Sequence, residues 1–120
     1  MGVRKWDLVW AALDPAVGHE QSGRRPVLVF CNDVIAGPIR LATVLPLTTW
    51  KVGRRVYPTE VKLLAGTGGL TVDSLVLAHQ IRTISARRLS LPFGALEEDA
   101  DRRQIVAALR TWLGLHDRPA

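Results

Sequence analysis

Apolar and polar residues alternate in several short segments of this chain, which is the pattern of β-strands with one buried face. In residues 3–10, the apolar Trp6, Leu8 and Trp10 occupy every second position, so we expect a half-buried strand there. The alternation in Pro58–Leu63 predicts another such strand, and continuous apolar runs predict buried strands. These runs are Val27–Cys31, Leu41–Leu47, which bends or ends near Pro46, and Ser74–Ala78, with a short extra strand in Gln80–Ile84.

Glycine, proline and polar residues separate these segments and predict connections. The expected loops, connections and turns are Asp14–Arg25, Asn32–Pro38, the basic and exposed Thr48–Val56, and Gly66–Gly69. One helical turn is expected in Ser85–Leu89.

The end of the chain has helical periodicity. Four acidic residues in 97–101 favour the positive end of a helix dipole, and Gly114 stands where a helix-ending glycine belongs. Between them lies an apolar stripe, formed by Ile105, Val106, Leu109, Trp112 and Leu113. Short strands followed by one amphipathic helix predict a mainly β fold with α, a single domain over residues 1–120. We expect a barrel or a strongly curved antiparallel sheet covered by the helix. A parallel βαβ architecture is disfavoured because no helical pattern separates the early strands.

Basic residues are concentrated in the first four fifths of the chain. Residues 1–96 hold 12 Lys and Arg against 6 Asp and Glu, whereas residues 97–120 hold 4 against 5. This distribution favours a polyanionic partner such as nucleic acid, although mildly basic domains also occur for solubility alone. The single cysteine, Cys31, cannot form an intramolecular disulfide, and neither a signal peptide nor a membrane span is evident. We therefore expect a cytoplasmic protein with no membrane association.

Metal and nucleotide motifs are missing from the sequence. The three histidines, His19, His79 and His116, have no ligand spacing with one another or with Cys31, so no metal site is expected. Gly66–Gly69 lacks the lysine of a phosphate-binding loop. The candidate chemistry therefore lies in the polar and basic loops.

Two residues at the ends of predicted strands are candidates for phosphate chemistry. Arg25 stands beside the rigid Pro26, with Arg24 next to it, and an arginine held there suits a phosphate whose charge grows during cleavage. Thr48 follows the strand that ends at Leu47. The alternatives are a surface arginine paired with Glu20 and a threonine in a turn.

A series of motifs makes the chain resemble the MazF/PemK family of toxin endoribonucleases over nearly its whole length. Their order and spacing make the resemblance specific, whereas each alone is weak. The motifs are Trp10–Pro15, Gly18-x-Glu-Gln-x-Gly-x-Arg-Pro26, Asn32-Asp33, Leu45–Thr48, Tyr57–Val61, Asp73-Ser74, Gln80–Thr83 and Leu113–Leu115.

The resemblance implies an SH3-like, plasmid-toxin-type barrel that forms a homodimer and cuts single-stranded RNA without a metal or cofactor. It also implies an antitoxin that blocks the RNA groove. In this family the positions of Arg25 and Thr48 are catalytic. Three further matches, Gln21, Gln80 and Arg82, line or support the site, and we expect them to contact RNA. Glu20 matches a site position too and is our candidate general base.

The loop after Thr48 is the expected RNA platform. Lys51, Arg54 and Arg55 would follow phosphates, and Trp50 would stack on bases, unless the loop is simply solvated or Trp50 packs in a dimer interface. His19 and His79 are further candidates for proton transfer. Two other functions stay open: a toxin of this fold that poisons a protein such as DNA gyrase, and a barrel that binds nucleic acid without cutting it.

Overall fold

A computed structural model describes residues 2–14, 17–21 and 23–115 of the chain. Pro15 of the first motif and His116 lie outside these residues. The strands are β1 (Asp7–Ala12), β2 (Arg24–Val29), β3 (Leu41–Thr49), β4 (Glu60–Leu63), β5 (Ser74–Leu77), β6 (Arg82–Ser85) and β7 (Leu89–Ala95). The α-helices are α1 (Asp33–Ile39) and α2 (Asp99–Leu113), and the 3₁₀ turns are η1 (Thr67–Gly69), η2 (Ala78–Gln80) and η3 (Ala86–Arg88).

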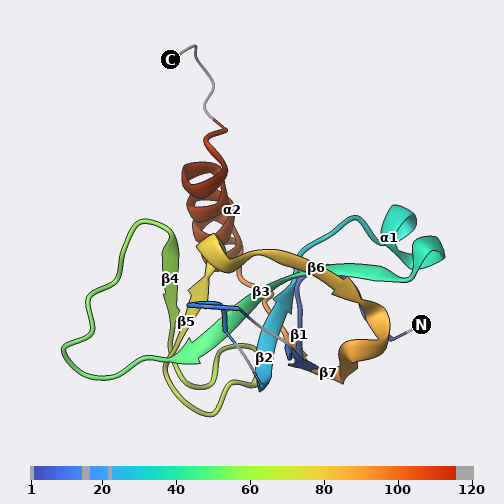
Figure 1. Cartoon of the computed structure of the whole chain (residues 1–120). Coiled ribbons are helices and arrows are strands. Elements are labelled where there is room, and N and C mark those ends of the chain that lie inside the picture. Colours follow the sequence, from blue (N-terminus) through green and yellow to red (C-terminus); the bar gives the residue numbers. More distant parts are fainter. Residues whose placement is uncertain (1, 15–16, 22, 116–120) are drawn as a thin grey trace.

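The strands form one antiparallel sheet in the order β4-β5-β3-β2-β1-β7, with β6 paired to β3 (Figure 1). In the described part of the chain, β4 and β7 are its two ends and are not paired with each other. The prediction of a mainly β fold with a terminal helix is confirmed, in the form of a sheet that stays open.

The nine-residue strand β3 connects the parts of this sheet. One of its edges pairs with β2, and the other pairs first with β6 through Val44 and then with β5 from Leu47 onward. Pro46, which has no N–H to donate, falls in the gap between these two partners. A proline is therefore tolerated inside a central strand. The sequence suggested that the strand bends or ends near Pro46, and instead it changes partner there and continues to Thr49.

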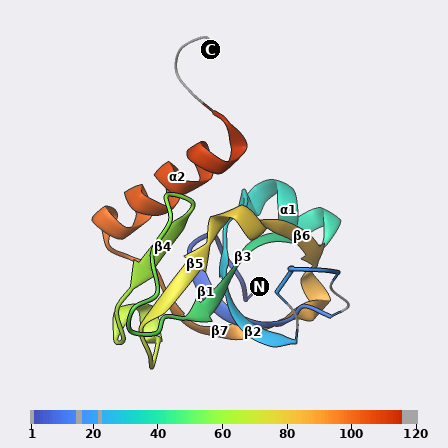
Figure 2. The ribbon, with the colours of Figure 1, turned by 60° about the vertical axis from the view of Figure 1, so that its left-hand side comes forward.

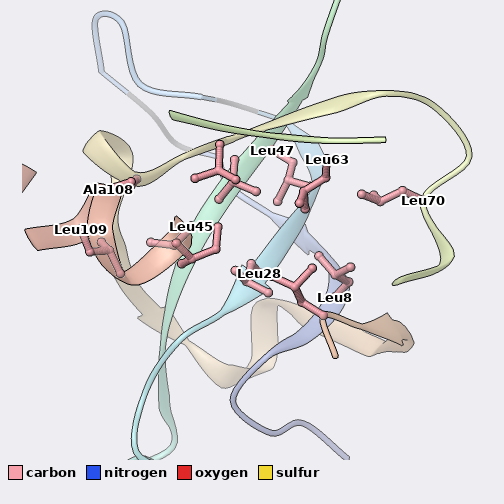
Figure 3. Packing of buried hydrophobic residues seen from close by; sticks show 13 residues of the cluster. Leu8, Leu28, Leu45, Leu47, Leu63, Leu70, Ala108 and Leu109 are labelled. Carbon is pink, nitrogen blue, oxygen red and sulfur yellow. The ribbon is translucent and has the colours of Figure 1, made fainter. Parts of the chain in front are cut away.

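Both faces of the central strands are buried. On one face, leucines of β1, β2 and β3 meet Val61 and Leu63 of β4 and the inner side of α2 (Figure 3). On the other face, Val9 and Ala11 of β1 pack with valines of β2 and β3. The expectation that the first strand is half-buried was therefore wrong, since Leu8, Val9 and Ala11 are all fully buried.

Trp10 lies between the buried Val9 and Ala11, yet 40% of its surface is exposed. The pairing of β1 with β7 shifts register between Leu8 and Val9 and again between Val9 and Ala11. Both shifts insert an extra residue in β7, whereas β1 pairs with β2 residue by residue from Leu8 to Ala12. Trp10 therefore keeps the regular alternation of β1 and lies on the same face as Leu8, but at a place that the core does not fully cover.

The terminal helix α2 packs against β4 and η2, whereas α1 lies beside β3 at a separate place (Figures 1 and 2). Ile105 and Leu109 of the predicted stripe are buried, but Trp112 and Leu113 are about half exposed. Gly114 ends the helix, as predicted: it takes the left-handed conformation (φ 70°), and its N–H donates to carbonyl oxygens of the last turn. None of the helices in the described ranges is long and apolar enough to cross a membrane.

One α-helix and one strand were not predicted. The helix α1 forms where Gly37 and Pro38 indicated only a connection, and its first turn is tied to Asn32, whose side chain accepts the Val34 N–H at 3.0 Å. The strand β7 contains Pro92 and Gly94 and has irregular register, so it lacks the alternation that identifies a strand.

Candidate active site

The structure brings Arg25 and Thr48 together at the ends of two neighbouring strands. β2 and β3 pair with Val27 opposite Pro46, Leu28 opposite Leu45 and Val29 opposite Val44. When this antiparallel register is continued by two residues from the pair of Val27 and Pro46, Arg25 lies opposite Thr48. Both residues are partly buried and line one cavity of about 310 Å³. We call this cavity the Arg25 cavity.

Two further cavities continue from it along the surface. The middle cavity, about 320 Å³, shares Thr48 and Thr49 with the Arg25 cavity. The outer cavity, about 330 Å³, shares His79 and Gln80 with the middle one. Because neighbouring cavities have lining residues in common, the three lie next to one another, and we refer to them together as the groove. Eight of the predicted site residues line it: Glu20, Gln21, Arg25, Thr48, Lys51, Arg54, Gln80 and Arg82.

Gln80 holds the loop that follows β1 against the rest of the groove. Its Oε1 accepts the Gln21 N–H at 2.7 Å, and its Nε2 donates to the His19 carbonyl at 3.3 Å. Arg82 acts similarly, since its Nη1 donates to the Leu13 carbonyl at 3.3 Å. Gln21 and Gln80 are 59 residues apart in sequence, so these bonds fix the position of one groove wall relative to the sheet.

Glu20 lies in the outer cavity, away from the cavity of Arg25 and Thr48. The carboxylate accepts the Val17 N–H at 2.6 Å, within its own loop. His79 lines both the middle and outer cavities, and its Nδ1 is 3.2 Å from the Thr59 hydroxyl.

Three predicted RNA contacts lie outside the lining of the groove. Trp50 donates its indole N–H to the Arg54 carbonyl at 3.0 Å and has the Lys62 ammonium 3.4 Å from the centre of its ring. Arg55 lies over Tyr57, and Arg24 lies over Trp10 at 5.7 Å.

A buried carboxylate that sequence reasoning missed anchors the loop after β3. The side chain of Glu60 is only 4% exposed and forms two bonds with the Arg54 guanidinium, at 3.0 and 2.8 Å. It also accepts the Tyr57 N–H at 3.0 Å. Burial alone would raise the pKa of Glu60, but the bonds from Arg54 and Tyr57 outweigh it and hold the pKa below 4.5. The alternation of apolar and polar residues in 58–63 had indicated that Glu60 is an ordinary strand residue. Such a pattern gives no information about an ion pair with Arg54.

We expect Glu60→Gln to lower stability at neutral pH and to have much less effect in acid. A carboxyl group whose pKa is lower in the folded state stabilises the fold above its unfolded pKa, and this stabilisation is lost as the pH falls through the folded pKa. The measurement is the urea midpoint at about pH 7 and about pH 3.5. The exposed Glu97→Gln is the matched control. An equal loss at both pH values would show that the charge of Glu60 does not stabilise the fold.

Within the described ranges, no three His, Cys, Asp or Glu side chains cluster in a way that could hold a metal ion. The polar groups of the groove are instead arginine, lysine, hydroxyl and amide groups, with Glu20, Glu60 and two histidines. Guanidinium and hydroxyl donors at its inner end suit an anion such as a phosphate.

Comparisons with known proteins agree with this arrangement. Residues 4–113 match the family described as PemK-like, MazF-like toxin of type II toxin-antitoxin systems. The chain is 38% identical over 118 residues to endoribonuclease MazF9 of Mycobacterium tuberculosis, covering 94% of this chain and 98% of the relative. It is 36% identical over 99 residues to endoribonuclease EndoA of Bacillus subtilis, covering 82% and 84%.

A solved structure, MazF of Deinococcus radiodurans, superposes with a TM-score of 0.80 at 31% identity, covering 96% of this chain and 99% of that one. The chain therefore belongs to the PemK-like, MazF-like toxin family of type II toxin-antitoxin systems. The family resemblance seen in the sequence motifs is confirmed.

Proposed function

We propose that the chain is an endoribonuclease that cuts single-stranded RNA at the Arg25 cavity. The observation that supports this most directly is the convergence of Arg25 and Thr48 in one cavity at the end of a long groove. Both aligned relatives are named endoribonucleases. The net charge of +5 and the cations along the groove favour a polyanionic substrate.

The proposed reaction is attack by a ribose 2′-oxygen on the adjacent phosphorus. The O2′–P bond forms and the P–O5′ bond breaks, which gives a 2′,3′-cyclic phosphate and a 5′-hydroxyl. The 2′-OH loses a proton, and the leaving oxygen gains one. Because the nucleophile is part of the substrate and already close to the phosphorus, the reaction requires no metal-activated water.

The groove residues have distinct roles in this proposal. Arg25 balances the charge that develops on the phosphorane oxygens, and Thr48 donates a hydrogen bond to one of them. Glu20 is the proposed proton acceptor, because an arginine stays protonated near neutral pH and is a poor base. Since Glu20 lies in the outer cavity, this role requires its loop to move toward the Arg25 cavity when RNA binds. Lys51 follows the phosphates of the bound strand, and Gln21, Gln80 and Arg82 hold the groove wall against it. Arg54 holds the loop through Glu60. Outside the lining, Arg24, Trp50 and Arg55 extend the RNA contacts.

Two protein partners belong to the proposal. As a toxin of a toxin-antitoxin family, the chain would be held inactive by an antitoxin, and a basic groove favours an acidic segment that folds on binding. We also propose a homodimer. Val34 and Ile39 of α1 are 83% and 60% exposed, and large apolar side chains left on a small domain are candidates for a subunit interface.

The test is to incubate the purified chain with a long RNA in EDTA and to map any new ends. We expect sequence-specific fragments with 5′-hydroxyl ends, and no cleavage of the same sequence as DNA, which lacks the 2′-OH. Intact RNA would overturn the proposal. Inhibition of DNA gyrase would then indicate a toxin that acts on a protein, and a shifted RNA complex would indicate binding without cleavage.

A further inference from the structure

One wall of the Arg25 cavity is aromatic, which the proposed cleavage chemistry does not use. Trp10 and Phe93 both line the cavity, with ring centres 6.2 Å apart and planes inclined by 44°. Trp10 is 40% exposed although its neighbours Val9 and Ala11 are fully buried. Trp10 from the regular strand β1 and Phe93, the extra residue at the first register shift of β7, together give the cavity that holds Arg25 and Thr48 a large aromatic surface.

The rest of the cavity lining mixes apolar residues, such as Leu47 and Val72, with polar ones. The polar ones include Thr48, Thr49, Thr71 and Arg25, which carry hydroxyl and guanidinium groups. An aromatic face with hydrogen-bonding groups at its edges is how proteins hold an unstacked base of single-stranded RNA. A volume of about 310 Å³ is at the lower end for small-ligand sites, so a single base fits the size better than a larger ligand.

The cavity is held in shape by contacts between backbones. The turn η1 lies so close to β7 that a Cβ on Gly69 would be 2.8 Å from the Phe93 carbonyl oxygen. A Cβ on Gly94 would be 1.8 Å from the carbonyl oxygen of Gly68. These contacts fix Phe93 relative to the segment Gly69–Val72, which forms the facing part of the lining. A rigid pocket loses little conformational entropy when a base enters it.

We propose that the Arg25 cavity is a nucleobase subsite, in which the base of a nucleotide next to the cleaved phosphate stacks on Trp10 and Phe93. The proposal rests on the proposed function, since Arg25 and Thr48 place the phosphate at the same cavity. Arg24, 5.7 Å from the Trp10 ring, adds a cation where the backbone of that nucleotide leaves the cavity. Stacking holds the base, and hydrogen bonds from the threonines of the lining to its edge select the sequence that is cut.

The first test compares cleavage of a single-stranded RNA by Trp10→Leu, Phe93→Leu and the milder Trp10→Phe. We expect the leucine variants to raise KM by roughly 5- to 150-fold, which is the value of one stacked base, with little change in kcat. Sequencing of fragment ends should show a weaker base preference at one position beside the cut. Leu91→Ala, on β7 but 78% exposed, is the matched control and should leave both parameters unchanged.

The second test separates this subsite from the cleavage proposal. Oligonucleotides with a 2′-deoxyribose at the cut cannot react, and each carries one abasic position beside it. We expect that one oligonucleotide of this series, the one that lacks the base held by the subsite, binds the wild type more weakly than the intact oligonucleotide does. Trp10→Leu should bind these two oligonucleotides equally well. If folded Trp10→Leu and Phe93→Leu keep the wild-type KM and base preference, the subsite is overturned while cleavage stands. If the wild type cuts nothing, the cleavage proposal fails, and the abasic series still tests the subsite.

Discussion

Arg25→Ala is expected to reduce the cleavage rate by about 10²–10³, or roughly 3–4 kcal/mol of transition-state stabilisation. Arginine is a fixed cation with paired donors, and at a partly buried position its effect on the developing phosphorane charge is larger than it would be in bulk water. Thr48→Ala should act in the same direction. The measurement is single-turnover cleavage of an RNA that carries the preferred site, so that kcat is separated from binding.

The control is Arg103→Ala, which removes an equal charge from an exposed position on α2. It should cut at the wild-type rate. Arg25→Lys tests geometry, because it retains the charge but not the paired donors, and it should recover only part of the loss. Thermal unfolding of each variant shows whether the fold is intact. Near-normal cleavage by folded Arg25→Ala would remove this residue from the mechanism.

The residues around Arg25 are compatible with a cation of the active site and with an ordinary surface arginine. The order and spacing of the family motifs favoured the active site. The pairing of β2 with β3 explains why the motif of Arg25 and the motif of Thr48 meet at one site. Arg25 and Thr48 are 23 positions apart in sequence, and antiparallel pairing of Val27 with Pro46 brings them to one level. That register could not be read from the sequence, although both strands were predicted. The helix α2 was easier, because its periodicity and Gly114 are local signals.

The residues that sequence reasoning misplaced depend on contacts between distant segments. Trp10 was assigned to a buried pattern, but it is part of the cavity wall, beside Phe93 of the irregular strand β7. Glu60 had the appearance of a strand surface residue, and its bonds with Arg54 and the Tyr57 N–H explain how a carboxylate is buried there. Neither contact leaves a periodic signal in the sequence. The composition of the groove was therefore predicted better than the shape of its aromatic end.

The second large effect expected is loss of stability in Gly94→Ala, on the order of 3 kcal/mol or more. Gly94 pairs with Leu8 in the sheet, and its added Cβ would meet the Gly68 carbonyl oxygen at 1.8 Å. A Cβ is fixed by its own backbone and the Gly68 oxygen is a backbone atom, so no side-chain rotation relieves the clash. Either η1 or β7 must move, and the core leucines beneath them lose contact. The measurement is the urea midpoint of unfolding at constant slope.

Gly114→Ala is the comparison that isolates backbone strain. Gly114 has φ 70° with no atom within 4 Å of its added Cβ, so alanine there costs about 1 kcal/mol from conformation alone. Gly94→Ala should be clearly worse, because its cost comes from the backbone contact that also shapes the Arg25 cavity. Equal losses in the two variants would contradict a tight packing of η1 on β7. Such a result would also weaken the nucleobase subsite, since the rigidity of its wall depends on the same contact.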